Sequence, residues 1–208
     1  MEKPKVKVLL KVILLTVLLT LFFPWSTLQA QEPEIKFDHS AQLNAEPLGA
    51  FIQDRDGFLW IGTKSGLIKY NGLDIQVYKQ GPNSVSDNWI CSLLEDQHGM
   101  LWIGTGSTGL NKYDKNTDTF TYYQHDPDNP NSLTSNNITC TAPQALFEDK
   151  AGILWIGTDE GLNKFDPATE TFIYYQNNPN DPHSLSHNHV FAIFEDSAGT
   201  LWVGTKEG

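Results

Sequence analysis

The chain has 208 residues, with 14 basic and 25 acidic side chains and a formal net charge of −11 at pH 7. A surface with this charge repels phosphate groups, so neither nucleic acid nor a strongly anionic ligand is expected as a partner. A neutral or cationic ligand is easier to accommodate.

Residues 1–30 have the layout of a secretory signal peptide. Lysines at positions 3, 5, 7 and 11 form a basic start, residues 12–23 form an apolar run without charge, and Ala30 precedes polar Gln31. The run is shorter than the roughly 20 residues of a membrane span, and an uncleaved anchor is the alternative. Cleavage after Ala30 removes four lysines and one glutamate, which leaves 10 basic and 24 acidic residues. Residues 31–45 are predicted to form a lead-in strand.

From there on the chain is a repeat. The segment Leu-Trp-(Ile/Val)-Gly-Thr occurs at residues 59–63, 101–105, 154–158 and 201–205, each time after an Asp-x-x-Gly turn. Short runs of aromatic and β-branched residues alternate with turn residues, and sustained helical periodicity is missing from residues 31–208. Four strands in roughly 45 residues match one blade of a β-propeller.

The predicted fold class is therefore all-β, with propeller blades of four antiparallel strands. The blades cover about residues 46–80, 88–124, 137–176 and 189–208, so three blades are followed by the first half of a fourth. The third copy carries about five extra residues around positions 139–143. Because the pattern stops inside a blade, the chain is expected to be the amino-terminal fragment of a longer protein.

In its order of motifs the chain resembles the two-component regulator propeller repeat family. The motifs are Asp-x-x-Gly, Leu-Trp-x-Gly-Thr, Gly-Leu-x-Lys-(Tyr/Phe) and Phe-x-x-Tyr, and the resemblance covers about residues 35–208. It implies a periplasmic sensor region, often for oligosaccharides, in a membrane-anchored, homodimeric parent with a downstream histidine kinase and response regulator. The enzyme activity would belong to those missing parts.

Trp89 is the exception to the repeat. Trp60, Trp102, Trp155 and Trp202 recur at one position and are expected to pack between blades, whereas Asn137 and His189 hold the position of Trp89 in later copies. A ring beside amides suits a neutral sugar. The predicted ligand-binding residues are Trp89, Asn88, Asn136, Asn137, Asn188 and His189.

Two long loops on the predicted face of Trp89 extend this hypothesis. The first long loop (residues 125–136) and the second long loop (residues 176–188) carry polar candidates: Asp126, Asp128, Asn129, Asn131, Asn180, Asp181 and His183. Loops on a rigid scaffold often bind ligands. The alternative is that these residues only form turns.

Other chemistry has little support. The glycines of residues 104–109 spell a dinucleotide fingerprint, but they are expected to join two strands. A metal site at His183, His187 and His189 is not favoured, because these residues replace ordinary loop residues of the preceding copy. The Glu-Asp pairs recur before each turn, which favours a structural role. No metal, cofactor or catalytic residue is predicted.

The two cysteines leave two alternatives open. Cys91 and Cys140 lie near the first strands of adjacent blades, so a disulfide is sterically conceivable, or Cys91 is a small buried apolar residue. The function predicted from all these features is a periplasmic sensor domain that recognises a carbohydrate. The alternatives are a secreted propeller enzyme acting on polysaccharide and a protein-interaction scaffold.

Overall fold

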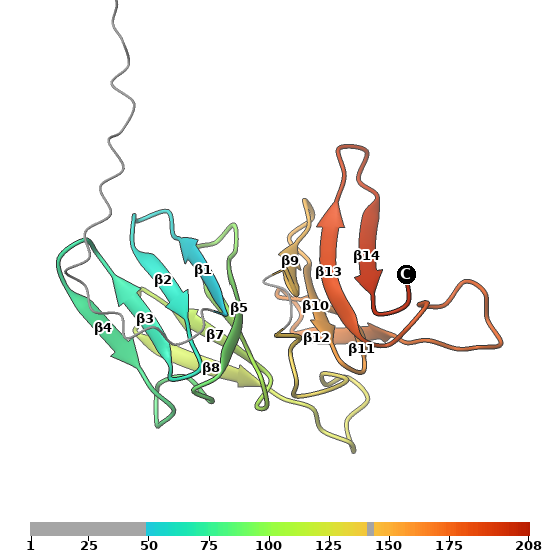
Figure 1. Ribbon diagram of the computed structural model, residues 1–208, viewed down its shortest axis with the longest axis horizontal. Helices are drawn as coiled ribbons and strands as arrows, with labels where there is room; N and C mark the ends of the chain where they lie inside the picture. Colours follow the sequence, from blue (N-terminus) through green and yellow to red (C-terminus); the bar gives the residue numbers. More distant parts are fainter. Residues whose placement is uncertain (1–48, 141–143) are drawn as a thin grey trace, which may run out of the picture. The chain divides into compact units, whose positions relative to one another are not determined.

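The computed structural model describes residues 49–140 and 144–208, and these residues form β-strands and turns without a helix (Figure 1). The predicted signal peptide (1–30) and lead-in strand (31–45) lie outside the described residues. The chain divides into two units, Met1–Gln42 and Leu43–Gly208, and all elements below belong to the second. A helix that could cross a bilayer is not found in the described part of the chain.

The described strands form three four-stranded antiparallel sheets and one two-stranded sheet, as the repeats predict. The first sheet contains β1 (Ala50–Gln53), β2 (Leu59–Gly62), β3 (Leu67–Tyr70) and β4 (Ile75–Tyr78). The second contains β5 (Ile90–Glu95), β6 (Leu101–Thr105), β7 (Leu110–Asp114) and β8 (Thr119–Tyr123). The third contains β9 (Leu146–Glu148), β10 (Leu154–Thr158), β11 (Gly161–Asp166) and β12 (Thr171–Tyr175). The fourth contains β13 (Val190–Glu195) and β14 (Leu201–Thr205).

The extra residues of the third copy are inserted at the position where the first strand of the second and fourth sheets has a β-bulge. In β5 the pairing with β6 shifts at Cys91, and in β13 it shifts at the equivalent Phe191. In the third sheet Ile138 forms an isolated bridge with Thr158, and β9 begins only at Leu146. A bulge already leaves one residue unpaired, so an insertion there disturbs few ladder hydrogen bonds.

One hydrogen bond positions the tryptophan of every repeat. The indole Nε1 donates to the turn aspartate six residues earlier, at 2.8 or 2.9 Å, in the pairs Trp60–Asp54, Trp102–Asp96, Trp155–Asp149 and Trp202–Asp196. The second oxygen of the aspartate accepts two backbone N–H groups of its turn, as Asp54 does from Asp56 and Phe58. One carboxylate thus closes the turn and satisfies the indole, which explains the constant spacing of the two residues.

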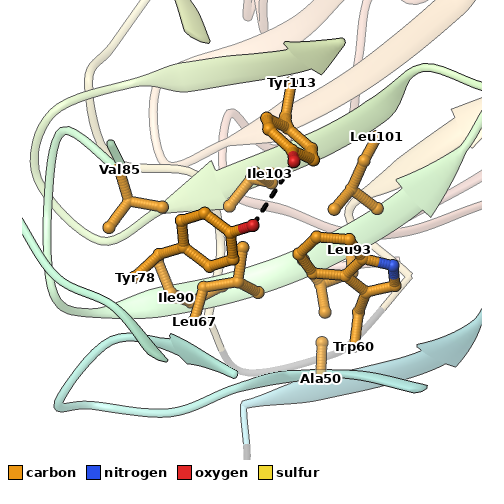
Figure 2. Close-up of a cluster of buried hydrophobic side chains, with 10 residues drawn as sticks. All are labelled: Ala50, Trp60, Leu67, Tyr78, Val85, Ile90, Leu93, Leu101, Ile103 and Tyr113. Atoms are coloured by element: carbon orange, nitrogen blue, oxygen red, sulfur yellow. Dashed lines mark hydrogen bonds between the residues drawn. The ribbon is translucent and has the colours of Figure 1, made fainter. Parts of the chain in front are cut away.

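Neighbouring sheets bury the tryptophan between aromatic rings. Trp60 is fully buried, stacks on Tyr78 of its own sheet at 5.8 Å between ring centroids, and meets the edge of Tyr113 from the second sheet at 5.5 Å. Figure 2 shows these rings and the 3.3 Å hydrogen bond between the two tyrosine hydroxyls. Trp102 is held in the same way by Tyr123 and Phe165, the latter from the third sheet.

The burial of the tryptophans falls along the chain. Trp60 and Trp102 are fully buried, Trp155 is half-buried, and Trp202 is 61% exposed. The aromatic residue that covers each ring comes from the third strand of the following sheet, and the described residues place no such strand over Trp155 or Trp202. The prediction of packing between blades is confirmed for Trp60 and Trp102, and Trp155 packs in part against Val190 and Ile193 of the fourth sheet. For Trp202 it stays a prediction, because the described residues contain no sheet that follows the fourth.

The glycine and threonine of the repeated segment also have fixed tasks. A Cβ atom at Gly62 or Gly104 would lie 2.7 or 2.6 Å from the side chain of Ile90 or Ile138, so glycine lets the first strand of the following sheet approach. The threonine closes the turn between the second and third strands, because Thr63 Oγ1 donates to a main-chain carbonyl three residues ahead at 2.8 Å.

The Glu-Asp pairs join consecutive sheets. Glu95, Glu148 and Glu195 each accept a backbone N–H from the turn of the preceding sheet, at 2.8 to 3.1 Å. Lys115 of the second sheet reaches the first sheet, where its Nζ lies 3.2 Å from Asp54 and 2.7 Å from Asp56. The predicted structural role of the glutamates is confirmed by these contacts.

We expect Trp102→Ala to lower the free energy of unfolding by about 3–5 kcal/mol, because it empties a buried site the size of an indole. Trp202→Ala is the matched control, since it removes the same hydrogen bond from an exposed ring, and its cost should stay below about 1 kcal/mol. Urea denaturation of both variants measures the difference. Equal losses would contradict the role of the covering sheet.

Acid should destabilise the first turn. Burial alone would raise the pKa of Asp54, but hydrogen bonds from Trp60, Phe58 and Lys115 outweigh it and hold this pKa below its ordinary value. The unfolded chain therefore binds the proton more readily, so this contribution to stability is lost as the pH falls below about 4. Denaturation of Asp54→Asn over a pH series should show a shallower acid loss than the wild type, and an identical slope would refute the assignment.

Candidate ligand-binding face

Three of the six predicted ligand residues hold loops closed. Asn88, Asn136 and Asn188 are equivalent in the repeat. The side-chain oxygen of each accepts a backbone N–H near the start of its loop, from Gln80 at 2.9 Å, His125 at 2.7 Å and Asn177 at 2.6 Å. Because all three copies make this contact, it is structural. Their shared position in the repeats was the signal that could have revealed this role.

The other three residues occupy the next position along the chain. The carbonyl oxygens of Trp89, Asn137 and His189 each accept an N–H from the turn that follows the second strand of the same sheet: from Gly106 at 3.0 Å, Asp159 at 3.4 Å and Lys206 at 3.0 Å. These three side chains therefore stand beside equivalent turns of the second, third and fourth sheets, as the repeat predicts.

Trp89 presents a partly exposed ring on a rigid support. The ring is 42% exposed, and a Cβ atom at Gly106 would lie only 2.7 Å from it, so the ring rests on the glycine backbone. The Nζ atom of Lys64, from the first sheet, lies 5.3 Å from the ring centroid. Asp87 accepts the N–H of Trp89 and the hydroxyl of Ser107. Gly106, the middle glycine of residues 104–109, therefore leaves room for the ring of Trp89. The segment joins β6 to β7, as predicted.

Asn137 belongs to a segment that also bonds to this turn. The N–H of Ile138 donates to the carbonyl of Thr105, while the next residue, Gly106, donates to Trp89. Asn137 Nδ2 in turn donates to Asp159 at 2.9 Å. The segments that carry Trp89 and Asn137 therefore both bond to the turn between β6 and β7.

His189 is separate from Trp89. Its ring packs on Phe191 at 4.6 Å between centroids, and its N–H donates to His187 Nδ1 at 2.9 Å.

A disulfide joins the segments that carry Trp89 and Asn137. Cys91 of β5 and Cys140 of the insertion are bonded, with their Cα atoms 4.4 Å apart. Of the two alternatives that the sequence left open, the structure therefore favours the bridge. It holds the first strand of the second sheet against the segment that enters the third, and both segments bond to the turn between β6 and β7.

The polar residues of the two long loops act mainly as turn formers. In the first long loop, Asp126 and Asn129 each accept the backbone N–H of the residue two positions ahead, at 3.0 Å. In the second long loop, Asn178 and Asp181 do the same at 3.1 and 2.9 Å. The alternative reading of these residues as turn formers is thus confirmed for Asp126, Asn129 and Asp181.

A hollow of about 260 Å³ nevertheless opens against the first long loop. Asp126, Asn129 and Leu133 line it together with Gln176 and Tyr174, whose ring is 45% exposed. Sequence reasoning missed Tyr174, because an equivalent tyrosine in the preceding repeat made it look like part of the scaffold.

A second hollow, of about 570 Å³, is a core position without its cover. Its lining includes Trp155, Leu162, Tyr175 and Leu185. The equivalent residues of the second sheet surround Trp102, where Phe165 of the third sheet fills the space. We therefore do not assign a ligand to this hollow.

Potential metal ligands gather at one place in residues 49–140 and 144–208. Asp54, Asp56 and Glu95 converge there, but Lys115 Nζ lies 2.7 Å from Glu95 and contacts the other two, so an ammonium group already balances their charge. The three histidines of the second long loop and its end do not form such a group within this part of the chain.

Comparison with known proteins places the repeats in a family. The family model described as two component regulator propeller matches residues 42–65, 84–107, 132–160 and 184–207. A segment of 41 residues is 54% identical to "Histidine kinase P4" of Formosa agariphila. This segment makes up 20% of this chain and 3% of that protein.

Solved structures agree with this fold. A chain described as the extracellular domain of the hybrid two component system BT3049 of B. thetaiotaomicron is 28% identical, with a TM-score of 0.67, over 76% of this chain and 22% of that one. The extracellular domain named BT4673, from the same organism, is 27% identical, with a TM-score of 0.63, over 83% and 22%. This chain thus spans about a fifth of both domains. Virginiamycin B lyase of Staphylococcus aureus, at 13% identity and a TM-score of 0.56 over 76% and 50%, shares the fold alone.

We expect reduction of the Cys91–Cys140 bond to destabilise the chain. Opening a loop closed over a separation of 49 residues should lower the free energy of unfolding by about 4 kcal/mol, because the unfolded chain gains conformational entropy. Urea denaturation with and without a thiol reductant measures this loss. In a variant with both cysteines replaced by alanine, the reductant should leave the free energy of unfolding unchanged. If it also left the free energy of unfolding of the wild type unchanged, the bridge would be contradicted.

Proposed function

We propose that this chain, which belongs to the two-component regulator propeller family, is the ligand-recognition part of an extracytoplasmic sensor, and that its ligand is a carbohydrate. The observation that carries the proposal is the partly exposed ring of Trp89, which rests on the backbone of Gly106 and has the Nζ atom of Lys64 5.3 Å from its centroid.

The chemistry around Trp89 fits a sugar. The apolar face of a pyranose ring packs on an indole, and its hydroxyls need donors and acceptors at the rim. Lys64 offers a donor near the ring, and Asp87, which accepts the N–H of Trp89 and the hydroxyl of Ser107, offers a carboxylate beside it. Because the backbone of Gly106 supports the ring, little side-chain entropy is lost when a ligand binds.

An extracytoplasmic location is supported by three independent features. The chain contains a disulfide between Cys91 and Cys140, and disulfides persist in oxidising compartments. The similar structures from B. thetaiotaomicron are extracellular domains. Residues 1–30 have the layout of a signal peptide. We infer that the chain is exported to the periplasm.

Within the parent protein, binding would bias two arrangements of a homodimer and so change the activity of a histidine kinase region. A catalytic function in the chain itself is less well supported. The recurring carboxylates at Glu95, Glu148 and Glu195 are occupied by backbone N–H groups of neighbouring turns. The likeness to a lyase concerns the fold alone.

Calorimetric titration tests the carbohydrate proposal. Hexaoses of glucose, mannose, xylose and galactose are the probes, and at least one should release heat with the wild type. Trp89→Ala should weaken that binding by about tenfold to a hundredfold, because removing a stacking face costs about 1–3 kcal/mol. Trp89→Phe, which keeps an aromatic face, should lose less.

Tyr174→Ala is the matched control, since it removes a similarly exposed ring that lines the hollow beside the first long loop. It should leave the affinity unchanged if the sugar lies on Trp89, and it would move the site to the first long loop if it alone abolished binding. Melting temperatures of all three variants establish that they are folded. An absence of heat with every hexaose would favour the protein-interaction scaffold instead.

A further inference from the structure

Two buried side-chain oxygen atoms at the start of the third sheet have no hydrogen-bond partner. They are Thr139 Oγ1 and Asp159 Oδ1, and no other buried side-chain nitrogen or oxygen within residues 49–140 and 144–208 lacks one. The Thr139 side chain is almost completely enclosed, with 2% of the residue exposed. Buried polar groups are paired in nearly all folded proteins, because an unpaired one carries the full cost of leaving water. Two such atoms in one part of the fold indicate a bound group that contacts both.

The backbone directs both side chains to one face of the third sheet. The N–H of Asp159 donates to the carbonyl of Asn137, and the N–H of Thr139 donates to the carbonyl of Gly157. These bonds set Asn137 opposite Asp159 and Thr139 opposite Gly157 in an antiparallel pair. Because side chains alternate between the two faces of a strand, Asn137, Thr139 and Asp159 share a face. The 2.9 Å bond from Asn137 Nδ2 to Asp159 Oδ2 agrees with this arrangement.

This face lies inside the molecule, against the fourth sheet. A Cβ atom at Gly157 would lie 2.9 Å from the side chain of Val190 in β13, so the space beside the glycine is enclosed by the following sheet. Thr139 and Asp159 are diagonal neighbours on the face, with Cα atoms about 7–8 Å apart and side chains that can approach more closely. A metal ion with oxygen ligands joins atoms up to about 5 Å apart, because each ligand lies about 2.3–2.6 Å from the ion when the metal is calcium.

The ligand atoms on this face are all oxygens. Asp159 offers one carboxylate oxygen and Thr139 a hydroxyl, and Asn137 adds an amide oxygen because its bond to Asp159 uses the nitrogen. Carboxylate, hydroxyl and amide oxygens are hard ligands of the kind that calcium prefers. They therefore favour a calcium ion over zinc or copper.

The charge of Asp159 also leaves a place for a cation. The ion pairs within the described residues involve Arg55, Lys115 or Lys150, and none of them includes Asp159. This distinguishes the site from the group of Asp54, Asp56 and Glu95, whose three acidic side chains already share the ammonium group of Lys115.

The repeat shows that the scaffold does not need these oxygens. Of the second, third and fourth sheets, only the third has oxygen-bearing side chains at all three positions. The equivalent residues are Trp89, Cys91 and Gly106 in the second sheet and His189, Phe191 and Lys206 in the fourth. The three oxygen-bearing residues are therefore particular to the third sheet, as expected of a site and not of a blade contact.

We propose that Asp159, Thr139 and Asn137 bind a calcium ion between the third and fourth sheets. The ion would join the residue that follows β10 to the segment that enters the third sheet. Because the protein supplies few ligands and one negative charge, the dissociation constant should lie at about 0.1–1 mM, the range of extracellular calcium modules. The inference does not depend on the carbohydrate proposal.

Calcium titration of the full chain, after treatment with a chelator, tests the site. Calorimetry with calcium chloride should show saturable binding by the wild type, and its melting temperature should rise with the calcium concentration. Asp159→Asn and Thr139→Val should each weaken this binding at least tenfold. Asp159→Asn keeps an oxygen that accepts from Asn137, so the fold should survive. Thr139→Val removes an unpaired buried hydroxyl, so with chelator present it should melt at or above the temperature of the wild type.

Asp128→Asn is the matched control, since it removes a carboxylate of the same charge from an exposed position in the first long loop. It should leave the calcium affinity unchanged. A wild type that releases no heat and keeps its melting temperature up to about 10 mM calcium, ten times the upper limit of the expected range, would overturn the proposal. Equal calcium affinities of the wild type, Asp159→Asn and Thr139→Val would overturn it as well, because the ion would then bind elsewhere.

Discussion

The hydrogen bond from each tryptophan indole to its turn aspartate is the contact on which the other features of this chain depend. It fixes a large ring at the same place in each sheet, at 2.8 or 2.9 Å in all four copies. A ring with a satisfied N–H can be buried at no polar cost, and burial of an indole supplies much of the apolar stabilisation of a blade. The strands and turns of each sheet, and the glycines that let the following sheet pack closely, are arranged around this ring.

Because the cover of each tryptophan comes from the next sheet, stability is shared between neighbours, as in other repeat proteins. The glutamate of each following sheet and the Lys115 cluster add polar contacts to the same interfaces. The scaffold therefore explains the repeated residues, and residues outside the pattern are left for function. Trp89 is the clearest of these, because its ring rests on the backbone of Gly106 and stays 42% exposed.

The sequence predicts the four-stranded antiparallel sheets because each strand is bounded by recurring turn residues. The site was predicted less well. Asn88, Asn136 and Asn188 recur just as the tryptophans do, and the same rule would have placed them in the scaffold. Lys115 has no counterpart, and its contact with Asp54 spans 61 positions, so no local pattern predicts it. The Cys91–Cys140 bond likewise depends on the path of the insertion.

Hydrogen exchange of the indole N–H groups, followed by NMR, tests most directly whether the following sheet is what secures each tryptophan. All four groups make the same hydrogen bond, so any difference in protection reports on the cover. The account predicts strong protection for Trp60 and Trp102, less for Trp155, and least for Trp202, in the order of their burial. Equal protection of all four indoles, under conditions that keep the chain monomeric, would contradict it.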